Sequence, residues 1–190
     1  MTNIVIFCAL KDEIEETKIG NCNIVFTGVG KVNAAISASK YLSQNTPSLA
    51  INYGTAGVIR NDIKGLVECG SAVQRDFDLR PLGFPLGANI GQKTPEIIRW
   101  SSGYHIATGD QFSTMPPEIN CDLVDMEAFA LAKACQSYRV PFRCVKFISD
   151  SSDTNAAQEW KQKLAQGASL FKDWLEENHN VLDTELCPPC

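Results

Sequence analysis

The sequence predicts an α/β protein with a mostly parallel or mixed central sheet. Short runs rich in apolar and β-branched residues, typical of buried strands, alternate along the chain with segments of helical periodicity. This alternation is the pattern of strands that are covered by the helices between them. The chain has 190 residues, of which 44% are hydrophobic, so it can form one domain with a sizeable core.

The charge balance argues against several classes of partner. The net charge is -5 and the chain has no block of basic residues, which disfavours nucleic acid and membrane surfaces. The longest apolar runs are far too short to span a bilayer. The first apolar run lacks a charged leader and ends at Lys11, Asp12 and Glu13, so we expect no signal peptide and a cytoplasmic location.

The eight cysteines are spread along the chain and do not resemble a disulfide framework. Several lie within strand or helix patterns, where a free cysteine behaves as a small hydrophobic residue. A reducing compartment is therefore the expected setting. Cys187 and Cys190 form a single C-x-x-C pair, which is weak support for zinc. We expect one domain at residues 1–177 and a poorly ordered tail at 178–190.

The individual elements follow from these patterns. Buried strands are predicted at residues 3–9, 23–27, 49–53, 66–74, 104–108 and 142–148, and helices at 10–16, 32–42, 126–138 and 156–177. Pro141 separates the third of these helices from the strand that follows it. The last helix is amphipathic, with Trp160, Phe171 and Trp174 on its apolar side.

Two glycine-containing segments are candidates for ligand contact. Residues 28–31 lie between a strand and a helix, where backbone N–H groups could cradle an anion. The G-x-G pattern lacks the third glycine of a dinucleotide fingerprint, because position 33 is Asn. The strand at 49–53 opens into residues 54–57, whose small side chains would let the backbone approach a ligand; a plain turn is an equal alternative.

A long irregular loop is expected at residues 76–93, because glycines and prolines interrupt it repeatedly. A loop of this length in a compact domain is usually functional or part of an interface. Leu82, Phe84 and Leu86 would be costly to expose singly in water, so we expect a partner subunit to cover them.

Acidic residues gather at one predicted edge of the sheet. Glu13 follows the first strand, Glu127 lies at a strand-to-helix junction, and Asp150 follows the strand at 142–148. Ligands of open α/β sheets bind at the carboxyl ends of the strands, so these acids could face one ligand. Each acid also has an ordinary explanation, as part of a solvated helix face, a first helical turn or an N-cap.

Aromatic and histidine residues give weaker signals. Phe112 follows the strand at 104–108 and could stack on a flat ring, although an aromatic residue of the core is the commoner case. His105 and His179 each lack a second ligand at metal spacing, so no metal site is predicted.

Seven sequence pieces, read in order, indicate a known family. They are CALKDEIE, TGVGKVNAA, INYGTAG, RPLGFPLG, ATGDQFST, VDMEAFALAKAC and FISDSSD, and they span most of the chain. The chain resembles the purine nucleoside phosphorylase/nucleosidase superfamily, and within it the 5′-methylthioadenosine/S-adenosylhomocysteine nucleosidase family. The resemblance implies a three-layer α/β/α sandwich around a mixed, partly barrel-like central sheet, in a homodimer.

The resemblance also implies a role for each matching residue. Asp150 would protonate purine N7, Glu13 would deprotonate the attacking water, and Glu127 would bind the ribose hydroxyls. The other matching positions would contact the substrate: Met126 at the sugar, Phe112 and Ser113 at the base, Thr55 near the sugar and water, Ser149 beside Asp150, Trp160 over the site, and Leu82 and Phe84 from the partner subunit in the 5′ pocket. No cofactor or metal is implied, because protonation and water suffice.

The chemistry of N-glycoside cleavage makes these residue types sensible. Positive charge develops on the ribose and negative charge on the leaving base, so an acid at the base and carboxylates near the sugar and water lower the barrier. The phosphorylases that this chain resembles place an arginine just before the G-x-x-G turn, where this chain has Asn52 and Tyr53. We therefore predict a hydrolase that cleaves 5′-methylthioadenosine, S-adenosylhomocysteine or both to free base and modified ribose.

Three alternatives stay open at this point. The chain could be a phosphate-dependent purine nucleoside phosphorylase, a nucleosidase for another 5′-modified nucleoside such as futalosine, or a non-catalytic nucleoside-binding module. The stretches between Thr17 and Asn23 and between Gly91 and Tyr104 are shorter than the resemblance leads one to expect, which leaves the preferred 5′ substituent open. Lys146 also stands where the family usually has arginine. Lysine keeps the positive charge but lacks the two-pronged hydrogen bonding of arginine.

Overall fold

The computed structural model describes residues 3–14, 22–59, 62–150 and 156–184, with the side chains of the last helix described from 163 to 178. The strands are β1 Ile4–Cys8, β2 Asn23–Phe26, β3 Leu49–Val58, β4 Leu66–Gln74, β5 Ile97–Arg99, β6 Tyr104–Thr108, β7 Leu123–Asp125 and β8 Phe142–Asp150. The α-helices are α1 Lys31–Gln44, α2 Ala128–Tyr138 and α3 Ala156–Thr184, and short 3-10 helices cover Lys11–Glu13 (η1) and Arg80–Leu82 (η3).

The strands form one mixed sheet that is partly closed into a barrel. Its order is β2-β1-β3-β7-β6-β4-β5, and β8 pairs with both β3 and β4. The β3–β8, β4–β6 and β6–β7 pairs are parallel, whereas β3–β7 and β4–β8 are antiparallel. Because β8 joins β3 to β4, the strands β3, β7, β6, β4 and β8 close a ring, from which β1 and β2 extend as a parallel wing. The predicted mixed, partly barrel-like sheet is confirmed.

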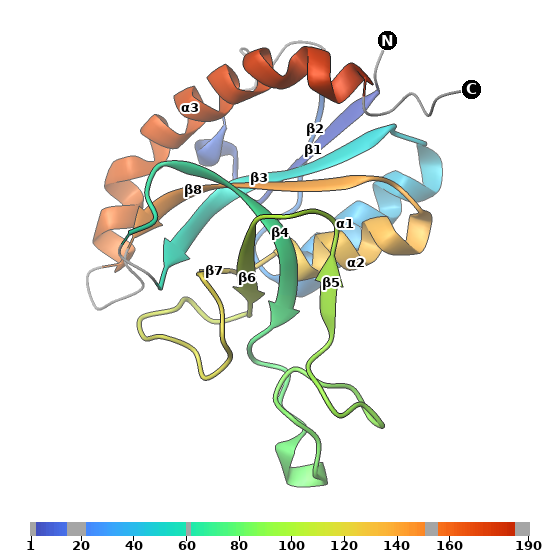
Figure 1. Ribbon diagram of the computed structural model, residues 1–190. Coiled ribbons are helices and arrows are strands. Elements are labelled where there is room, and N and C mark those ends of the chain that lie inside the picture. The colour runs from blue at the N-terminus through green and yellow to red at the C-terminus, as the bar shows by residue number, and fades with distance from the viewer. Residues whose placement is uncertain (1–2, 15–21, 60–61, 151–155, 185–190) are drawn as a thin grey trace.

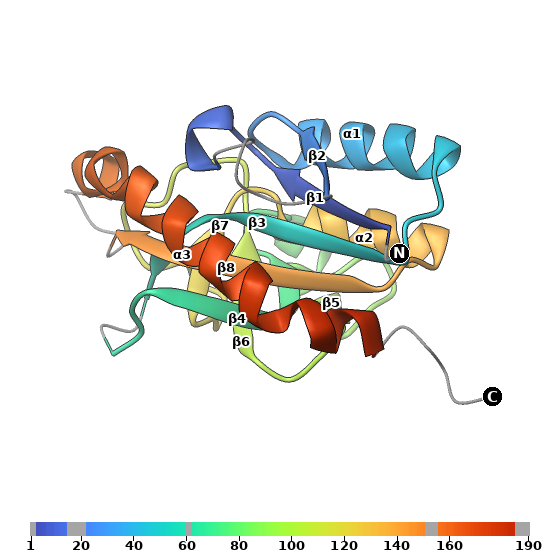
Figure 2. The same cartoon turned by 90° about the horizontal axis from the view of Figure 1, so that it is seen from above.

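Helices cover the sheet on two sides, as the sandwich requires. Figures 1 and 2 show α1 and α2 side by side on one face, and α3 running across the other face over β3 and β8. Strand β1 explains why both faces need cover. Val5 and Phe7 point into the core cluster under α1 and α2, whereas Ile4, Ile6 and Cys8 point into the cluster that contains Phe171 of α3. Alternate residues of one strand therefore fill two cores, which is why the strand is apolar throughout.

Several predicted boundaries were wrong. The strand predicted at 49–53 continues through Gly54–Gly57 to Val58, so these small residues belong to β3 and form no turn. Pairing with β8 along the whole length of β3 supplies the hydrogen bonds that keep this glycine-containing segment extended. The helix predicted at 10–16 is the short η1 among the described residues, and α3 continues past Glu177 to Thr184. Strand β5 was not predicted, because a three-residue strand shows no usable periodicity. Strand β7 is the short strand that the sequence placed before Glu127 without bounds.

The cysteines behave as the composition predicted in the part of the chain that the structure covers. Cys8, Cys69, Cys121, Cys135 and Cys144 are buried free thiols. Burial raises the pKa of Cys121 and of Cys135 to about 12, so both stay protonated at neutral pH. Cys187 and Cys190 lie outside the described residues. Within the described ranges, no helix is long and apolar enough to cross a membrane.

The packing of α3 against the barrel depends on a glycine. A Cβ added at Gly167 would lie 2.7 Å from Phe147 Cδ1 and 2.9 Å from the Tyr53 hydroxyl oxygen. Tyr53 also stacks on Phe171 of the same helix, with ring centroids 3.9 Å apart. The helix approaches β3 and β8 this closely because position 167 has no side chain.

We therefore predict that Gly167→Ala destabilises the protein by about 1–3 kcal/mol through overpacking. At an exposed helical position the same change would stabilise by about 1 kcal/mol, so the predicted sign is reversed. Urea denaturation measures the free energy of unfolding. Ser169→Ala, at an exposed position of the same helix, is the control and should change it by less than about 0.5 kcal/mol. A stabilised Gly167→Ala variant would show that α3 does not pack as described.

Candidate active site

One cavity lies at the carboxyl ends of β1, β3, β7 and β8. Its volume is about 180 Å³, well above the 10–15 Å³ or so that a single water needs on the same measure, so it can hold an organic ligand. Glu13, Glu127 and Asp150 all line it. The structure therefore brings together the three acids that the sequence predicted to converge, although they lie far apart in the chain. The other lining residues are Ala9, Leu10, Val29, Thr55, Ala56, Gly57, Arg75, Gln111, Phe112, Ser113, Val124, Asp125, Met126 and Ser149.

Glu13 is held at the cavity wall by hydrogen bonds to both carboxylate oxygens. Thr55 donates to Oε1 from its backbone N–H at 2.9 Å and from its hydroxyl at 2.8 Å. The Leu10 N–H donates to Oε2 at 3.2 Å, and the Cys8 thiol lies 3.6 Å from the same oxygen. The carboxylate is only 4% exposed. Its orientation is fixed by β3 and η1 before any ligand binds.

Glu127 begins helix α2 and reaches back to the glycine turn before α1. Its Oε1 accepts a hydrogen bond from the Gly30 N–H at 2.8 Å. Burial, and then the neighbouring charge of Asp125, raise the pKa of Glu127 to about 7, although Lys146 and the Gly30 N–H favour the ionised form. The carboxylate therefore changes its charge near neutral pH.

The glycine turn does not form an open anion cradle, contrary to the alternative that the sequence suggested. The Gly30 N–H donates to Glu127, and the Lys31 N–H donates to Asp110 Oδ1 at 2.7 Å. Side-chain carboxylates of the chain itself thus occupy the N-terminus of α1, where an external anion would otherwise bind.

Asp150 is the last residue of β8 and is 5% exposed. The Ser149 hydroxyl, which is completely buried, donates to Asp150 Oδ2 at 2.8 Å and lies 3.4 Å from the Ala56 carbonyl. The sequence predicted that this strand ends before Ser149. The strand continues to Asp150, because its pairing with β3 extends to the Gly57–Asp150 pair. The paired backbone holds Asp150 at the cavity rim.

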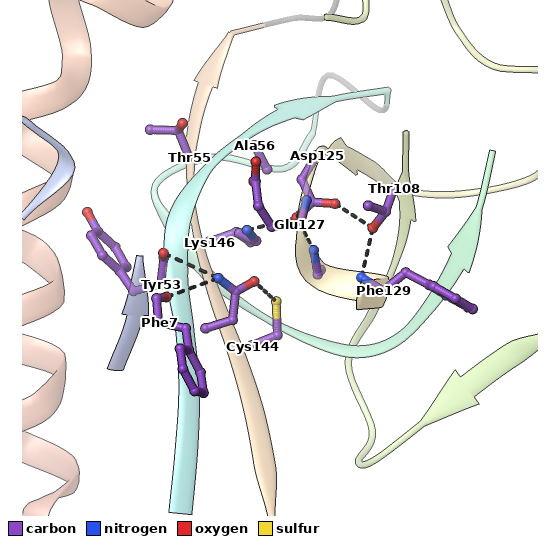
Figure 3. A network of polar contacts seen from close by, with 12 residues as sticks. Phe7, Tyr53, Thr55, Ala56, Thr108, Asp125, Glu127, Phe129, Cys144 and Lys146 are labelled. Atoms are coloured by element: carbon purple, nitrogen blue, oxygen red, sulfur yellow. Dashed lines mark hydrogen bonds and ion pairs between the residues drawn. The ribbon is translucent and has the colours of Figure 1, made fainter. Parts of the chain in front are cut away.

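A buried ion pair lies directly behind the three acids. Lys146 Nζ is 2.9 Å from Asp125 Oδ2, and both side chains are 1% exposed. Asp125 also accepts hydrogen bonds from the Thr108 hydroxyl at 2.6 Å and from the Ala128 N–H at 2.7 Å (Figure 3). Burial opposes the charge on Lys146, but the carboxylates of Asp125 and Glu127 outweigh it and raise the pKa of the lysine. Asp125 is therefore a structural acceptor with its lone pairs engaged.

Asn52 and Tyr53, which replace the arginine of the phosphorylases, face the protein interior. The Asn52 amide donates to the backbone carbonyls of Phe7 and Tyr53 and accepts from the Cys144 thiol (Figure 3). Both residues are 1% exposed. Neither one lines the cavity.

Of the remaining predicted positions, some line the cavity, others lie away from it, and one is not described. Thr55, Phe112, Ser113, Met126 and Ser149 line the cavity. Leu82 and Phe84 are absent from its wall and lie in the loop around η3, which Figure 1 shows projecting from the body. Leu82 is 65% exposed, whereas Phe84 is half-buried. The Trp160 side chain lies outside the described residues. The structure describes no cluster of His, Cys, Asp and Glu that could hold a metal ion.

Comparison with known proteins places the chain in a family. Residues 76–178 match the family model described as "Phosphorylase superfamily". A Bacillus cereus protein named 5′-methylthioadenosine/S-adenosylhomocysteine nucleosidase is 30% identical over 170 residues, which cover 75% of this chain and 73% of the relative. The chain belongs to the phosphorylase superfamily.

Other known proteins are similar to this chain over most of its length, in sequence or in fold. A Hydrogenovibrio crunogenus protein of the same nucleosidase name is 27% identical over 84% of each chain. A Helicobacter pylori nucleosidase of that name has a TM-score of 0.82 at 22% identity, over 95% of this chain and 98% of the other. A futalosine hydrolase from the same organism has a TM-score of 0.83 at 20% identity, over 93% and 97%. These likenesses confirm the fold of a superfamily member.

The buried ion pair of this superfamily member yields a stability prediction. Asp125→Asn leaves Lys146 buried without its carboxylate partner, and we expect a loss of about 3–5 kcal/mol in the free energy of unfolding. Guanidinium denaturation measures the loss. The control is Glu96→Gln, which removes the partner of Lys133 from a more exposed ion pair and should cost less than about 1 kcal/mol. Equal losses in the two variants would contradict the structural role of Asp125.

The raised pKa of Glu127 predicts a pH-dependent stability difference. The folded protein holds the proton up to about pH 7, whereas the unfolded chain releases it near the ordinary value of 4.5, so folding with Glu127 becomes less favourable as pH rises between these values. We expect Glu127→Gln to be more stable than the wild type at pH 8. The difference in unfolding free energy, variant minus wild type, should be about 2 kcal/mol larger at pH 8 than at pH 5. Thermal and urea unfolding at both pH values test this. A stability difference that does not change with pH would refute the raised pKa.

Proposed function

We propose that this member of the phosphorylase superfamily is a hydrolase that cleaves the N-glycosidic bond of a 5′-modified purine nucleoside. The products are the free base and the 5′-modified ribose. The single observation that supports this most strongly is the presence of Glu13, Glu127 and Asp150 in the wall of one cavity. N-glycoside hydrolysis needs an acid at the leaving base, a base for water and a carboxylate near the sugar, and three separate strand ends supply them.

Asp150 is assigned the role of general acid at purine N7. The Ser149 hydroxyl fixes one carboxyl oxygen, and the position at the end of β8 presents the side chain to the cavity. In this role the carboxyl group must hold its proton when the nucleoside binds, and then give it to the base. The departing base then leaves as a neutral species.

Glu13 and Glu127 are assigned to the water and the ribose. Thr55 and Leu10 hold Glu13 in one orientation, which suits a group that must remove a proton from a positioned water. Glu127 is held by Gly30 through one oxygen, and its carboxylate accepts hydrogen bonds from the ribose hydroxyls. Negative charge at both positions stabilises the positive charge that develops on the sugar.

Hydrolysis is favoured over phosphorolysis by the charges around the cavity. Among the described residues, its wall contains Glu13, Asp125, Glu127 and Asp150 but a single basic residue, Arg75. A phosphate nucleophile needs cations or free backbone N–H groups, and the N–H groups of the turn before α1 already donate to Glu127 and Asp110. Asn52 and Tyr53 supply no charge at the position where the phosphorylases have arginine.

The substrates proposed are 5′-methylthioadenosine and S-adenosylhomocysteine. Sequence relatives at 27–30% identity carry these substrates in their names. Futalosine is the second candidate, because a futalosine hydrolase superimposes as well as the nucleosidases do.

We also propose a homodimer in which the exposed Leu82 of the projecting loop meets a second copy of the chain.

The test is release of free base from 5′-methylthioadenosine, S-adenosylhomocysteine and futalosine in phosphate-free buffer, followed by chromatography. We expect release without phosphate and a fall of at least about 100-fold in kcat for Asp150→Asn, because general acid catalysis contributes roughly 10²–10⁴-fold. Asp173→Asn, which changes an exposed acid of α3 outside the cavity wall, is the control and should keep wild-type activity.

Strict dependence of turnover on phosphate would replace hydrolysis with phosphorolysis. Unchanged turnover in Asp150→Asn would remove Asp150 from the mechanism. Tight nucleoside binding by the wild type without any base release would support the non-catalytic binding module.

A further inference from the structure

We propose that Arg75 is a positioning residue that fixes the base-binding loop, residues 109–113, against the end of β4. This inference rests on the proposed function, because it assigns Phe112 and Ser113 to the base. Arg75 was not predicted from the sequence, yet in the part of the wall that the structure describes it is the single basic residue, and it lies there beside Gln111, Phe112 and Ser113.

The base-binding loop needs external support. It follows β6, and residues 109–122 contain no helix or strand. Phe112 is 46% exposed, so packing of its own ring does not hold it in place. The position of Phe112 therefore depends on how the backbone just before it is held.

Arg75 supplies that support through its guanidinium group. Nη2 donates to the carbonyl of Gln111, the residue directly before Phe112, and lies 3.4 Å from the carbonyl of Gly109. The guanidinium also packs on Gly109, where an added Cβ would lie 2.8 Å from Arg75 Cζ. Because the same nitrogen contacts two carbonyls of one loop, it restricts the loop more than a single contact would.

Neighbouring contacts anchor the start of the same loop but stop short of Phe112. The Gly109 N–H donates to the Asp125 carbonyl at 3.1 Å, and the Asp110 N–H donates to Asp76 Oδ2 at 2.7 Å. Lys31 pairs with Asp76 and donates its N–H to Asp110. These contacts end at residue 110. Arg75 extends the anchored region to Gln111, and so sets the direction in which Phe112 leaves it.

The two acids assigned to proton transfer, Glu13 and Asp150, are held independently of this support. Glu13 is held by Thr55 and Leu10, and Asp150 by Ser149. Loss of Arg75 should therefore weaken binding of the base and leave the chemical step nearly intact. A residue that merely stabilised the fold would not produce this separation between KM and kcat.

The experiment compares Arg75→Met with wild type by calorimetric binding of adenine and by turnover of 5′-methylthioadenosine. We expect the dissociation constant for adenine and the KM each to rise about tenfold, the scale of one lost hydrogen bond to a charged donor, with kcat within about threefold. Arg75→Lys keeps the charge without the planar fork, so it should restore the affinity in part. The control is Arg99→Met, at an exposed position of β5 outside the cavity wall, which should leave both values unchanged.

Gly109→Ala provides a second route to the same displacement, because the new methyl group would clash with the guanidinium. It should weaken adenine binding in the wild type and have a smaller effect in Arg75→Met, where a flexible side chain can move aside. If Arg75→Met does not fold, Arg75→Lys and Gly109→Ala carry the test.

Unchanged adenine affinity in Arg75→Met would overturn the inference, as would a fall in kcat at constant KM. Adenine binding by a wild type that releases no base would reject the proposed hydrolysis, and the binding comparison would still decide the role of Arg75. A wild type that binds no adenine would overturn the inference directly, since there would be no base subsite to position.

Discussion

The ion pair between Lys146 and Asp125 is the interaction on which the rest of the site depends. It joins β8 to the short β7 inside the closed part of the sheet, where both side chains are almost completely excluded from water. Burying two charges is costly unless their partners are fully provided, and Asp125 gains further donors from Thr108 and from the start of α2. The same pair thus holds the end of β7 and the start of α2 in a fixed relative orientation.

The positive charge of Lys146 also permits several carboxylates to lie close together. Glu13 and Lys146 converge on the same face of Gly54, where an added Cβ would lie 3.4 Å from Glu13 Oε1 and 3.6 Å from Lys146 Nζ. The lysine offsets part of the repulsion between Glu127 and Asp125, and it favours the ionised form of Glu127 against the effect of burial.

Backbone N–H groups of the chain also donate hydrogen bonds to its own carboxylates in and beside the site. The turn before α1 directs its N–H groups at Glu127 and Asp110, which couples the first helix to α2 and to the loop after β6. This arrangement accounts for two properties together. It orients the acid assigned to the ribose, and it removes a binding site for free phosphate. Both properties arise because a helix N-terminus stabilises negative charge, and here carboxylates of the chain itself supply that charge.

The sequence by itself determined the α/β class, most strands, the three α-helices apart from the end of α3, and the identity of the acids at the sheet edge. Buried strands and amphipathic helices have local periodicities, and acids that follow strands can be recognised without knowing how the strands pair. Tertiary structure decided what depends on contacts between distant segments. The continuation of β3 through Gly54–Gly57, the short strand β5, the bounds of β7, and the partners of Lys146 and Arg75 all arise from pairing across the closed sheet. A lone lysine or arginine in a sequence has no periodicity that reveals its partner, because its free energy depends on which charges the fold brings beside it.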